Sequence, residues 1–153
     1  MQKQIAMMKE FHQAFGHPTS RDEGLTIDNV KLRTKLMSEE LHELTEEIWD
    51  SEQNNDISPH LLKEGADLLY VLLGTFVSLG LGDQLIEAFD RVHISNMSKL
   101  GEDGKPIYRE DGKVLKGPNY KEPVLYDLIP YDCPHCRDVR DKDLISIHEC
   151  GCV

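Results

Sequence analysis

Residues 59–79 have the sequence PHLLKEGADLLYVLLGTFVSL, and the architecture of the protein follows from this segment. Pro59 suits the first turn of a helix, and Gly80 and Gly82 follow the apolar run as helix-ending residues. A helix this apolar is expected to be mostly buried. The uncharged run 68–81 is only fourteen residues long, which is short for a membrane span. We therefore expect a core helix of a globular protein.

Three further helices are predicted around it, over residues 1–15, 29–50 and about 83–100, with a polar loop at 16–26 and Asp28 as the cap of the second helix. The residues that recur at helical spacing, and that we expect to face the core, are Ile5, Met8, Phe11, His12 and Phe15, then Met37, Leu41, Leu44 and Ile48, then Leu85, Phe89, Val92 and Met97. Four helices with short connections predict an all-α fold with a four-helix bundle core.

The composition changes after the fourth helix. The pair Asp111-Gly112 lies between two short apolar pairs, which predicts a small C-terminal hairpin with a tight turn. Residues 131–153 form a cysteine-bearing tail. A chain of 153 residues has room for one domain and a small appendage. We expect an all-α domain over residues 1–125 and a C-terminal extension over residues 126–153.

The formal net charge of −11 bears on the class of partner. A protein that holds a nucleic acid polymer needs clustered Lys and Arg, so this charge argues against one. It agrees with a nucleotide substrate, because a triphosphate held through divalent cations requires protein carboxylates. The N-terminal residues have the pattern of an amphipathic helix and not of a signal peptide. We therefore expect a cytoplasmic protein that does not enter a membrane.

Acidic residues gather on the second helix beside its apolar stripe. Glu40, Glu43 and Glu47 are spaced three and four apart, so they share one face of the helix. For a run of glutamates alone, a solvated acidic face is the plain interpretation. A second acidic pair on the next helix changes that interpretation.

Glu64 and Asp67 are also three residues apart, and Asp67 is followed directly by the apolar run of the third helix. An unpaired ionised carboxylate buried there would cost several kcal/mol. Lys63 is the one Lys or Arg of that helix, and we expect it to lie elsewhere on the helical wheel. A divalent cation would neutralise the cluster, and oxygen ligands favour Mg²⁺ or Mn²⁺. Because magnesium completes its shell with waters and phosphates, a phosphoryl substrate is predicted.

The order of these motifs resembles a known family. EELHE at 39–43 followed by EGAD at 64–67 resembles the EExxE…ExxD signature of the MazG-like all-α nucleoside triphosphate pyrophosphohydrolases. That group is related to the phosphoribosyl-ATP pyrophosphohydrolases and to the all-α dimeric dUTPases. The resemblance continues through VHISNMSKL at 92–100 and DGKVLKGPNY at 111–120, and it covers about residues 1–125.

The resemblance implies hydrolysis between the α and β phosphates, giving a nucleoside monophosphate and pyrophosphate. The residues that match the metal ligands are Glu40, Glu43, Glu64 and Asp67. Glu39 matches a residue that ligates a further ion or activates the attacking water, so Glu39 and Glu43 are the candidate catalytic residues. The chemistry is consistent, since metals clamp phosphates and lower the pKa of a bound water while a nearby carboxylate accepts its proton.

Residues beyond the carboxylates are candidates for substrate binding. Asn96 and Lys99 lie one helical turn apart, and the resemblance places them at the same site, with Lys99 on a phosphate and Asn96 on metal-bound or sugar oxygens. The plain alternative for Lys99 is a cation favoured by a helix C-terminus. Lys116 and Tyr120 are candidates for closing over the substrate.

The base is expected to contact the first helix, where Phe11, His12 and Phe15 offer aromatic faces, unless these residues belong to the core. Some phage relatives act on dGTP, which suggests a purine substrate such as dGTP or GTP.

All four cysteines lie near the C-terminus, as a CxxC pair and a CxC pair formed by Cys133, Cys136, Cys150 and Cys152. This arrangement approximates a Cys₄ structural zinc site, and the alternative is a reduced, loosely ordered tail.

Two alternatives to a nucleoside triphosphate pyrophosphohydrolase remain open on the sequence. One is a non-enzymatic helical adaptor with a zinc-binding tail, and the other is a phosphoribosyl-ATP pyrophosphohydrolase. A homodimer or homotetramer is expected in either enzyme class, because the apolar third helix exceeds what a lone small bundle covers easily and because the resembled family forms such oligomers.

Overall fold

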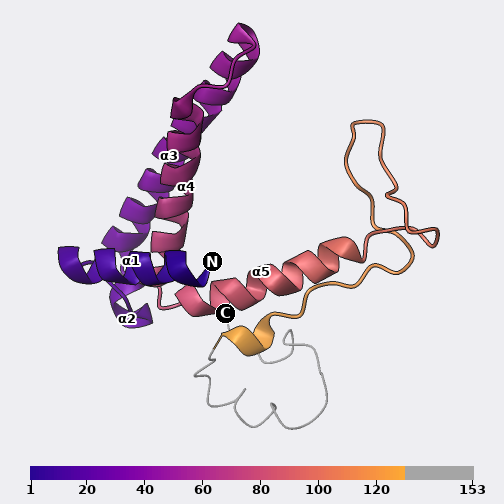
Figure 1. Ribbon diagram of the computed structural model, residues 1–153. Helices are drawn as coiled ribbons and strands as arrows, with labels where there is room; N and C mark the ends of the chain where they lie inside the picture. The colour runs from indigo at the N-terminus through magenta and orange to yellow at the C-terminus, as the bar shows by residue number, and fades with distance from the viewer. Residues whose placement is uncertain (130–153) are drawn as a thin grey trace, which may run out of the picture. The chain divides into compact units, whose positions relative to one another are not determined.

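The computed structural model describes residues 1–129 (Figure 1). Its helices are α1 (Gln2–Phe15), α2 (Arg21–Gly24), α3 (Ile27–Asn54), α4 (Pro59–Ser78), α5 (Gly82–Met97) and a 3₁₀ helix, η1 (Tyr126–Leu128). Across the described range the only β pairing is one isolated bridge. The predicted all-α fold class is therefore confirmed. The chain divides into two compact units, residues 1–93 and residues 94 onward, and each is described by itself.

Local sequence signals explain most helix ends. Gly16 ends α1 in the left-handed conformation at φ 69°, and the amide of His17 donates to the carbonyl of His12 at 2.8 Å. Pro59 takes the first position of α4 after Ser58, where its missing N–H is not needed. These signals could be recognised in the sequence, and the predicted boundaries of α1 and α4 lie within a residue or so of the observed ones.

Two boundary predictions are corrected. Residues 16–26, predicted as a loop, contain the single-turn helix α2. The second predicted helix begins earlier and ends later, as α3, and its cap is Thr26 in place of Asp28. Thr26 has extended backbone angles, and its hydroxyl oxygen accepts a hydrogen bond from the amide of Asn29 at 3.3 Å. Asp28 lies inside the first turn, where a carboxylate favours the positive end of the helix dipole.

Within residues 1–93, α3 and α4 run side by side as an antiparallel pair, and α1 crosses the C-terminal part of α4 (Figure 1). The core lies at that crossing. Its fully buried hydrophobic residues are Ile5, Met8, Leu73 and Val77, and Phe11, Leu85 and Ile86 pack against them. The C-terminal half of α4 is thus held by α1 and the start of α5.

Polar side chains are also buried at this crossing. His12 is completely buried, and Arg33 of α3 is 8% exposed. Arg33 donates from Nε to the hydroxyl of Thr75 at 3.2 Å and from Nη2 to the carbonyl of Val71 at 2.9 Å. A Cβ at Gly74 would lie 2.4 Å from Arg33 Nη2, so the glycine provides the space that this side chain occupies. Arg33 was not predicted as a core residue, because a charged side chain in a helix is ordinarily exposed.

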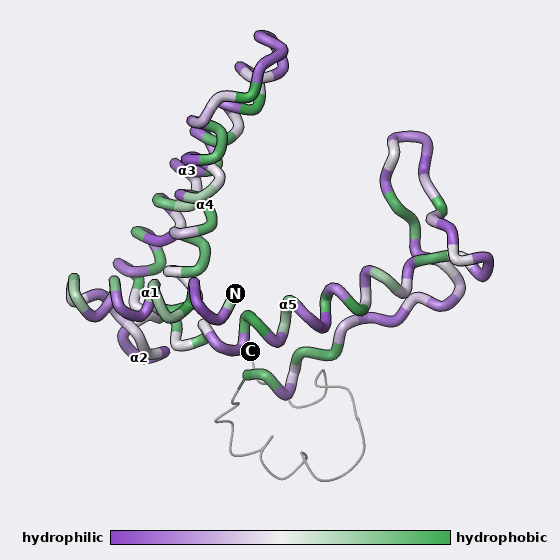
Figure 2. The backbone as a smooth tube through the Cα atoms, viewed as in Figure 1, coloured by the Kyte–Doolittle hydropathy of each residue, from purple (hydrophilic) through white to green (hydrophobic). Residues whose placement is uncertain are grey.

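The prediction that α4 is mostly buried is wrong for the single chain. Hydrophobic residues run along much of α4 (Figure 2), yet Leu62 is 76% exposed and Leu69 is 45% exposed. Other residues predicted to face the core are also exposed, namely Phe15, Leu41, Ile48, Phe89, Val92 and Met97. Helical spacing groups such residues on one face, but within their own described unit these side chains stay exposed.

In the second unit, the predicted hairpin turn is present. Tyr108 and Val114 form the antiparallel bridge, and the amide of Leu115 donates to the carbonyl of Ile107 at 2.7 Å. Gly112 occupies the turn at φ 83°.

The hairpin is followed by a segment that binds back to the end of α5. A Cβ at Gly117 would lie 2.5 Å from the carbonyl oxygen of Leu100, so only glycine fits this close approach, and its amide donates to the Lys99 carbonyl at 3.0 Å. The hydroxyl of Ser95 donates to the carbonyl of Lys121 at 2.7 Å.

Among the described helices, none alone is long and apolar enough to span a membrane, and α4 with α5 reaches that length and composition only as a pair bent by 117°.

Candidate metal centre

Three of the predicted ligands converge between α3 and α4. One carboxylate oxygen from each of Glu40, Glu43 and Glu64 lies within 4.8 Å of the other two. Glu40 and Glu43 are three residues apart on α3, so they share the face that α4 contacts. Leu44 lies 4.0 Å from the position a Cβ would take at Gly65, which shows how closely the two helices approach beside the cluster.

The buried carboxylate of this cluster is that of Glu64. Its side chain is 11% exposed, whereas the side chain of Asp67 is 44% exposed. The prediction that Asp67 is the buried acid is therefore wrong. The reason is that the apolar face of α4 next to Asp67 is itself open to solvent in the single chain.

Lys63 pairs with both acids of α4. Its Nζ lies 2.9 and 3.1 Å from the two carboxylate oxygens of Glu64 and 2.9 Å from Oδ2 of Asp67. The prediction that Lys63 points elsewhere on the helix is thus wrong. Residues four apart are neighbours on a helix, and the long lysine stem lets the ammonium reach Glu64 as well. These hydrogen bonds raise the pKa of Lys63, with Asp67 the larger cause.

The acidic surroundings alter the protonation of Glu40. Its partial burial raises the pKa of its carboxyl group, and the negative charges of Glu43, Asp67 and Glu64 raise it further, while Lys63 opposes them. A carboxylate whose charge is disfavoured by its neighbours gains from a cation placed among them.

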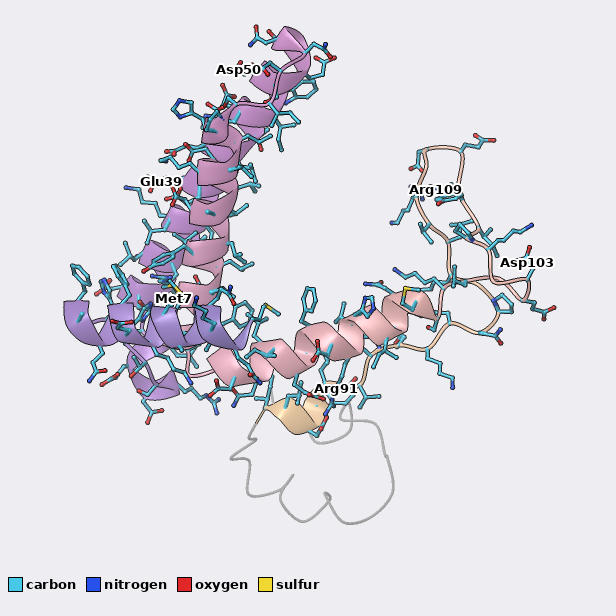
Figure 3. All side chains as sticks on the ribbon, in the orientation of Figure 1. Met7, Glu39, Asp50, Arg91, Asp103 and Arg109 are labelled. Carbon is cyan, nitrogen blue, oxygen red and sulfur yellow. The ribbon has the colours of Figure 1, made fainter. Side chains whose placement is uncertain are left out.

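The remaining acids of α3 lie outside the cluster of three. Glu39 is partway along α3, its side chain is 48% exposed, and it pairs with Lys35 at 3.4 Å (Figure 3). Glu47 accepts a hydrogen bond from the hydroxyl of Ser58 at 3.2 Å, and Asp50 lies farther along α3, away from α1. The catalytic role that the resemblance implies for Glu39 therefore stays a prediction.

Aromatic side chains of α1 gather against Tyr70 of α4, which lies one helical turn from Asp67. Phe11 lies 4.4 Å from Phe15 and 5.5 Å from Tyr70, ring centroid to centroid. These three residues, with Met7 and Glu10 of α1, line a pocket of about 280 Å³. Tyr70 follows Asp67 by three residues, a rise of about 4.5 Å along the helix. Phe11 and Phe15 were predicted to contact the base, whereas Tyr70 was not.

His12 of α1, the third aromatic candidate, is buried beside Gly74 of α4. Its Nδ1 lies 2.7 Å from the carbonyl oxygen of Pro18, and its role in the described structure is packing.

The candidates from the second unit lie near one another. Lys99 Nζ is 2.7 Å from Asn96 Oδ1, and Lys116 Nζ lies 4.2 Å from the ring centroid of Tyr120. Because the carboxylates belong to the first unit, a shared site between these four residues and the metal centre stays a prediction. The four cysteines of the predicted zinc site lie outside the described residues.

Comparison with known proteins indicates the class of this all-α protein, a pyrophosphohydrolase of nucleotides. The family model for phosphoribosyl-ATP pyrophosphohydrolase matches residues 8–96, more than half of the chain and the part that contains every carboxylate of the cluster. The chain belongs to this family, which is related to the MazG-like all-α pyrophosphohydrolases. Pyrophosphohydrolases of this family generally depend on a divalent metal. No curated protein matches the chain.

Proposed function

We propose that the protein hydrolyses a nucleoside or deoxynucleoside triphosphate between its α and β phosphates, with Mg²⁺ or Mn²⁺ as the metal. Water adds across the phosphoanhydride, and the products are a nucleoside monophosphate and pyrophosphate. The observation that carries the proposal is the convergence of Glu40, Glu43 and Glu64 within 4.8 Å in a chain of this family.

The residues present fit a divalent cation. Three carboxylates from two helices converge, one of them is buried, and Asp67 lies on the next turn of α4 as a fourth oxygen donor. When bound, the metal would neutralise phosphate charge and lower the pKa of a coordinated water. Glu39, exposed beside the cluster, would accept the proton of the attacking water.

The base would lie on the aromatic pocket formed with Phe11, Phe15 and Tyr70. This pocket is about one helical turn from Asp67, which suits a nucleotide whose phosphates face the carboxylates. Stacking on aromatic faces favours a base in general, and a purine offers the larger face. We therefore propose a purine nucleotide, dGTP or GTP, as the preferred substrate.

Phosphoribosyl-ATP is the second candidate substrate, and the description of the matched family favours it. It is a nucleoside triphosphate with an added phosphoribosyl group on its base, so the carboxylates would act on the same bond. The two substrates differ at the base end, where the aromatic pocket lies.

The test incubates the full chain with each common NTP and dNTP and with phosphoribosyl-ATP, in the presence of Mg²⁺ or Mn²⁺. Products are separated as monophosphate with pyrophosphate, or diphosphate with phosphate. Glu43→Gln and Asp67→Asn are compared with Asp50→Asn, an exposed acid of α3 at a distance from the cluster.

Release of monophosphate and pyrophosphate, lost in the first two variants and kept in the third, supports the proposal. Turnover that is confined to phosphoribosyl-ATP assigns the second candidate. No turnover of any nucleotide, or turnover unchanged in Glu43→Gln and Asp67→Asn, overturns the proposal and favours a non-catalytic helical adaptor.

We also propose that the active form is a homodimer or homotetramer. Large hydrophobic side chains on α3 and α4 are exposed in the single chain, among them Leu41, Ile48, Leu62 and Leu69. A second copy that covers these faces would remove apolar area from water and enclose the α3–α4 pair.

A further inference from the structure

Lys63 is a partly exposed lysine that has a buried acidic partner. Its ammonium bridges Glu64 and Asp67, at 2.9 Å from each, while its own side chain is 58% exposed. The partner carboxylate of Glu64 is fixed in a buried position between α3 and α4. The ammonium of Lys63 is therefore free to move into solvent, whereas the carboxylate of Glu64 is not.

The charges of the cluster of three and the neighbouring Asp67 are unbalanced without a further cation. Glu40, Glu43, Glu64 and Asp67 provide four carboxylates, and Lys63 is the one ammonium that pairs with them among the described contacts. An ionised carboxylate that is buried requires a partner, so the ammonium stabilises Glu64 in the folded chain.

The same oxygens are needed by a divalent metal. Both oxygens of Glu64 already lie within 3.1 Å of the ammonium, and an ammonium at that distance would repel a dication held by the same carboxylate. The four-carbon stem of lysine allows the ammonium to leave by side-chain rotation alone, without movement of α4.

We propose that Lys63 is an exchangeable counter-cation of the metal centre. Without metal its ammonium holds Glu64 and Asp67, and divalent metal binding displaces it into solvent. Lys63 is therefore a positioning residue that keeps the empty cluster folded and sets how tightly it takes up metal. The inference rests on the proposed function only in assigning the metal to these carboxylates.

The test measures Mn²⁺ binding to the substrate-free full chain from the loss of the free-ion paramagnetic resonance signal. Binding elsewhere is measured in a Glu43→Gln/Glu64→Gln variant and subtracted. In Lys63→Gln the Kd for Mn²⁺ is expected to fall about tenfold, since one positive charge no longer competes with the dication.

A second readout distinguishes exchange from a general charge effect. Without metal, Lys63→Gln should unfold at a lower temperature than the wild type, because Glu64 loses its partner. In saturating Mn²⁺ the two proteins should unfold at the same temperature, because the displaced lysine no longer contributes. Activity is not needed for either measurement.

Two control variants complete the design. Lys9→Gln removes the same charge and a 2.7 Å ion pair with Asp83 away from the cluster, and it should leave the Mn²⁺ Kd unchanged. Lys63→Arg retains the charge, so it should bind Mn²⁺ as weakly as the wild type does, with an unchanged Kd.

A Kd in Lys63→Gln that equals or exceeds that of the wild type overturns the exchange, as does a lack of Mn²⁺ binding in both proteins. Nucleotide cleavage with an unchanged Kd would overturn the role of Lys63 and leave the proposed function intact.

Discussion

The imidazole of His12 has two nitrogens in unequal surroundings. Nδ1 faces the carbonyl of Pro18, which can only accept, so Nδ1 carries the proton of the neutral ring. Nε2 is buried without a hydrogen-bond partner among the described residues, close to Gly74. Burial lowers the pKa of His12, the Pro18 hydrogen bond opposes this shift, and the positive charge of Arg33 adds to it. The core therefore favours the neutral ring of His12.

Acidification is predicted to destabilise the protein through His12. Because the pKa of His12 is lower in the folded state, the unfolded chain binds the proton at a higher pH than the folded chain does. The contribution of His12 to the free energy of unfolding is therefore fully present above the ordinary histidine pKa. This contribution falls as the pH decreases toward the pKa of the folded state. The slope from one histidine is at most about 1.4 kcal/mol per pH unit. Urea unfolding over a series of pH values measures it, and His12→Asn, which keeps a donor for Pro18 but cannot titrate, should show a shallower slope.

His60 serves as the control for this prediction, since its imidazole is exposed at the start of α4. His60→Gln should reproduce the wild-type slope. An equal slope in wild type and His12→Asn would show that the buried imidazole does not govern acid stability.

Glu64 is predicted to be the ligand whose loss weakens metal binding most. It is the buried member of the cluster, so its oxygens are fixed in place, whereas Glu43 is exposed. Glu64→Gln should weaken the Mn²⁺ Kd by at least about tenfold. Glu47→Gln is the matched control, because Glu47 shares the acidic face of α3 but bonds to Ser58 outside the cluster.

Calorimetric or spectroscopic titration with Mn²⁺ compares the two variants directly. If Glu47→Gln weakened binding as much as Glu64→Gln, the metal would have to lie farther along α3 than the cluster of three.

The residues of the metal centre could be predicted from sequence to the extent that they are motif positions. Spacing placed Glu40, Glu43 and Glu64 on facing sides of two helices, and these three converge. Spacing could not show which acid is buried, because burial depends on what covers α4. It also could not place Lys63, whose ammonium is separated from the backbone by a long flexible stem.

At the scale of elements, α2 packs on α4 through a residue that tolerates no side chain. A Cβ at Gly24 would lie 1.9 Å from the carbonyl oxygen of Ser78, and backbone atoms cannot rotate away. Asn29 ties the same junction, since its Nδ2 donates to the Gly24 carbonyl at 2.8 Å and lies 3.3 Å from the Ser78 hydroxyl. Gly24→Ala is predicted to lower the free energy of unfolding by about 1–3 kcal/mol.

Gly65→Ala is predicted to act in the opposite direction. Gly65 is inside α4, and the nearest atom to its added Cβ, in Leu44, is 4.0 Å away, an ordinary contact. Alanine should therefore raise the free energy of unfolding by about 0.5–1 kcal/mol through helix propensity. Denaturant unfolding of both variants at equal protein concentration provides the measurement, and a loss of stability in Gly65→Ala would mean that another surface approaches α4 at this position.

Helices were predictable as elements because caps and breakers act locally. Gly16 and Pro59 mark helix ends by their own backbone chemistry, without reference to the rest of the fold. The single turn of α2 is too short to show a period, so it was missed. The faces of α3 and α5 were assigned to a core on periodicity alone, and periodicity does not state whether the covering surface belongs to the same chain.

For the whole molecule, the balance of buried and exposed hydrophobic residues is uneven. Among residues 1–129, four hydrophobic side chains are fully buried, and residues as large as Trp49 and Phe89 are about 60% exposed. Contiguous exposed apolar faces of this kind mark interaction surfaces in soluble proteins. Leu41 and Ile48 are seven residues apart, so they form one such face along α3.

The last prediction concerns this face of α3. If a second copy covers it, the double variant Leu41→Glu/Ile48→Glu should sediment and scatter light as a monomer, while the wild type gives the mass of a dimer or tetramer. Burying two charges in place of two apolar side chains would cost more than the contact provides.

Gln53→Glu adds a charge at an exposed polar position of the same helix and should keep the wild-type mass. A wild type that is monomeric, or a double variant that stays assembled, would show that the face has another role. In that case the exposed residues of α4, Leu62 and Leu69, become the surface to test.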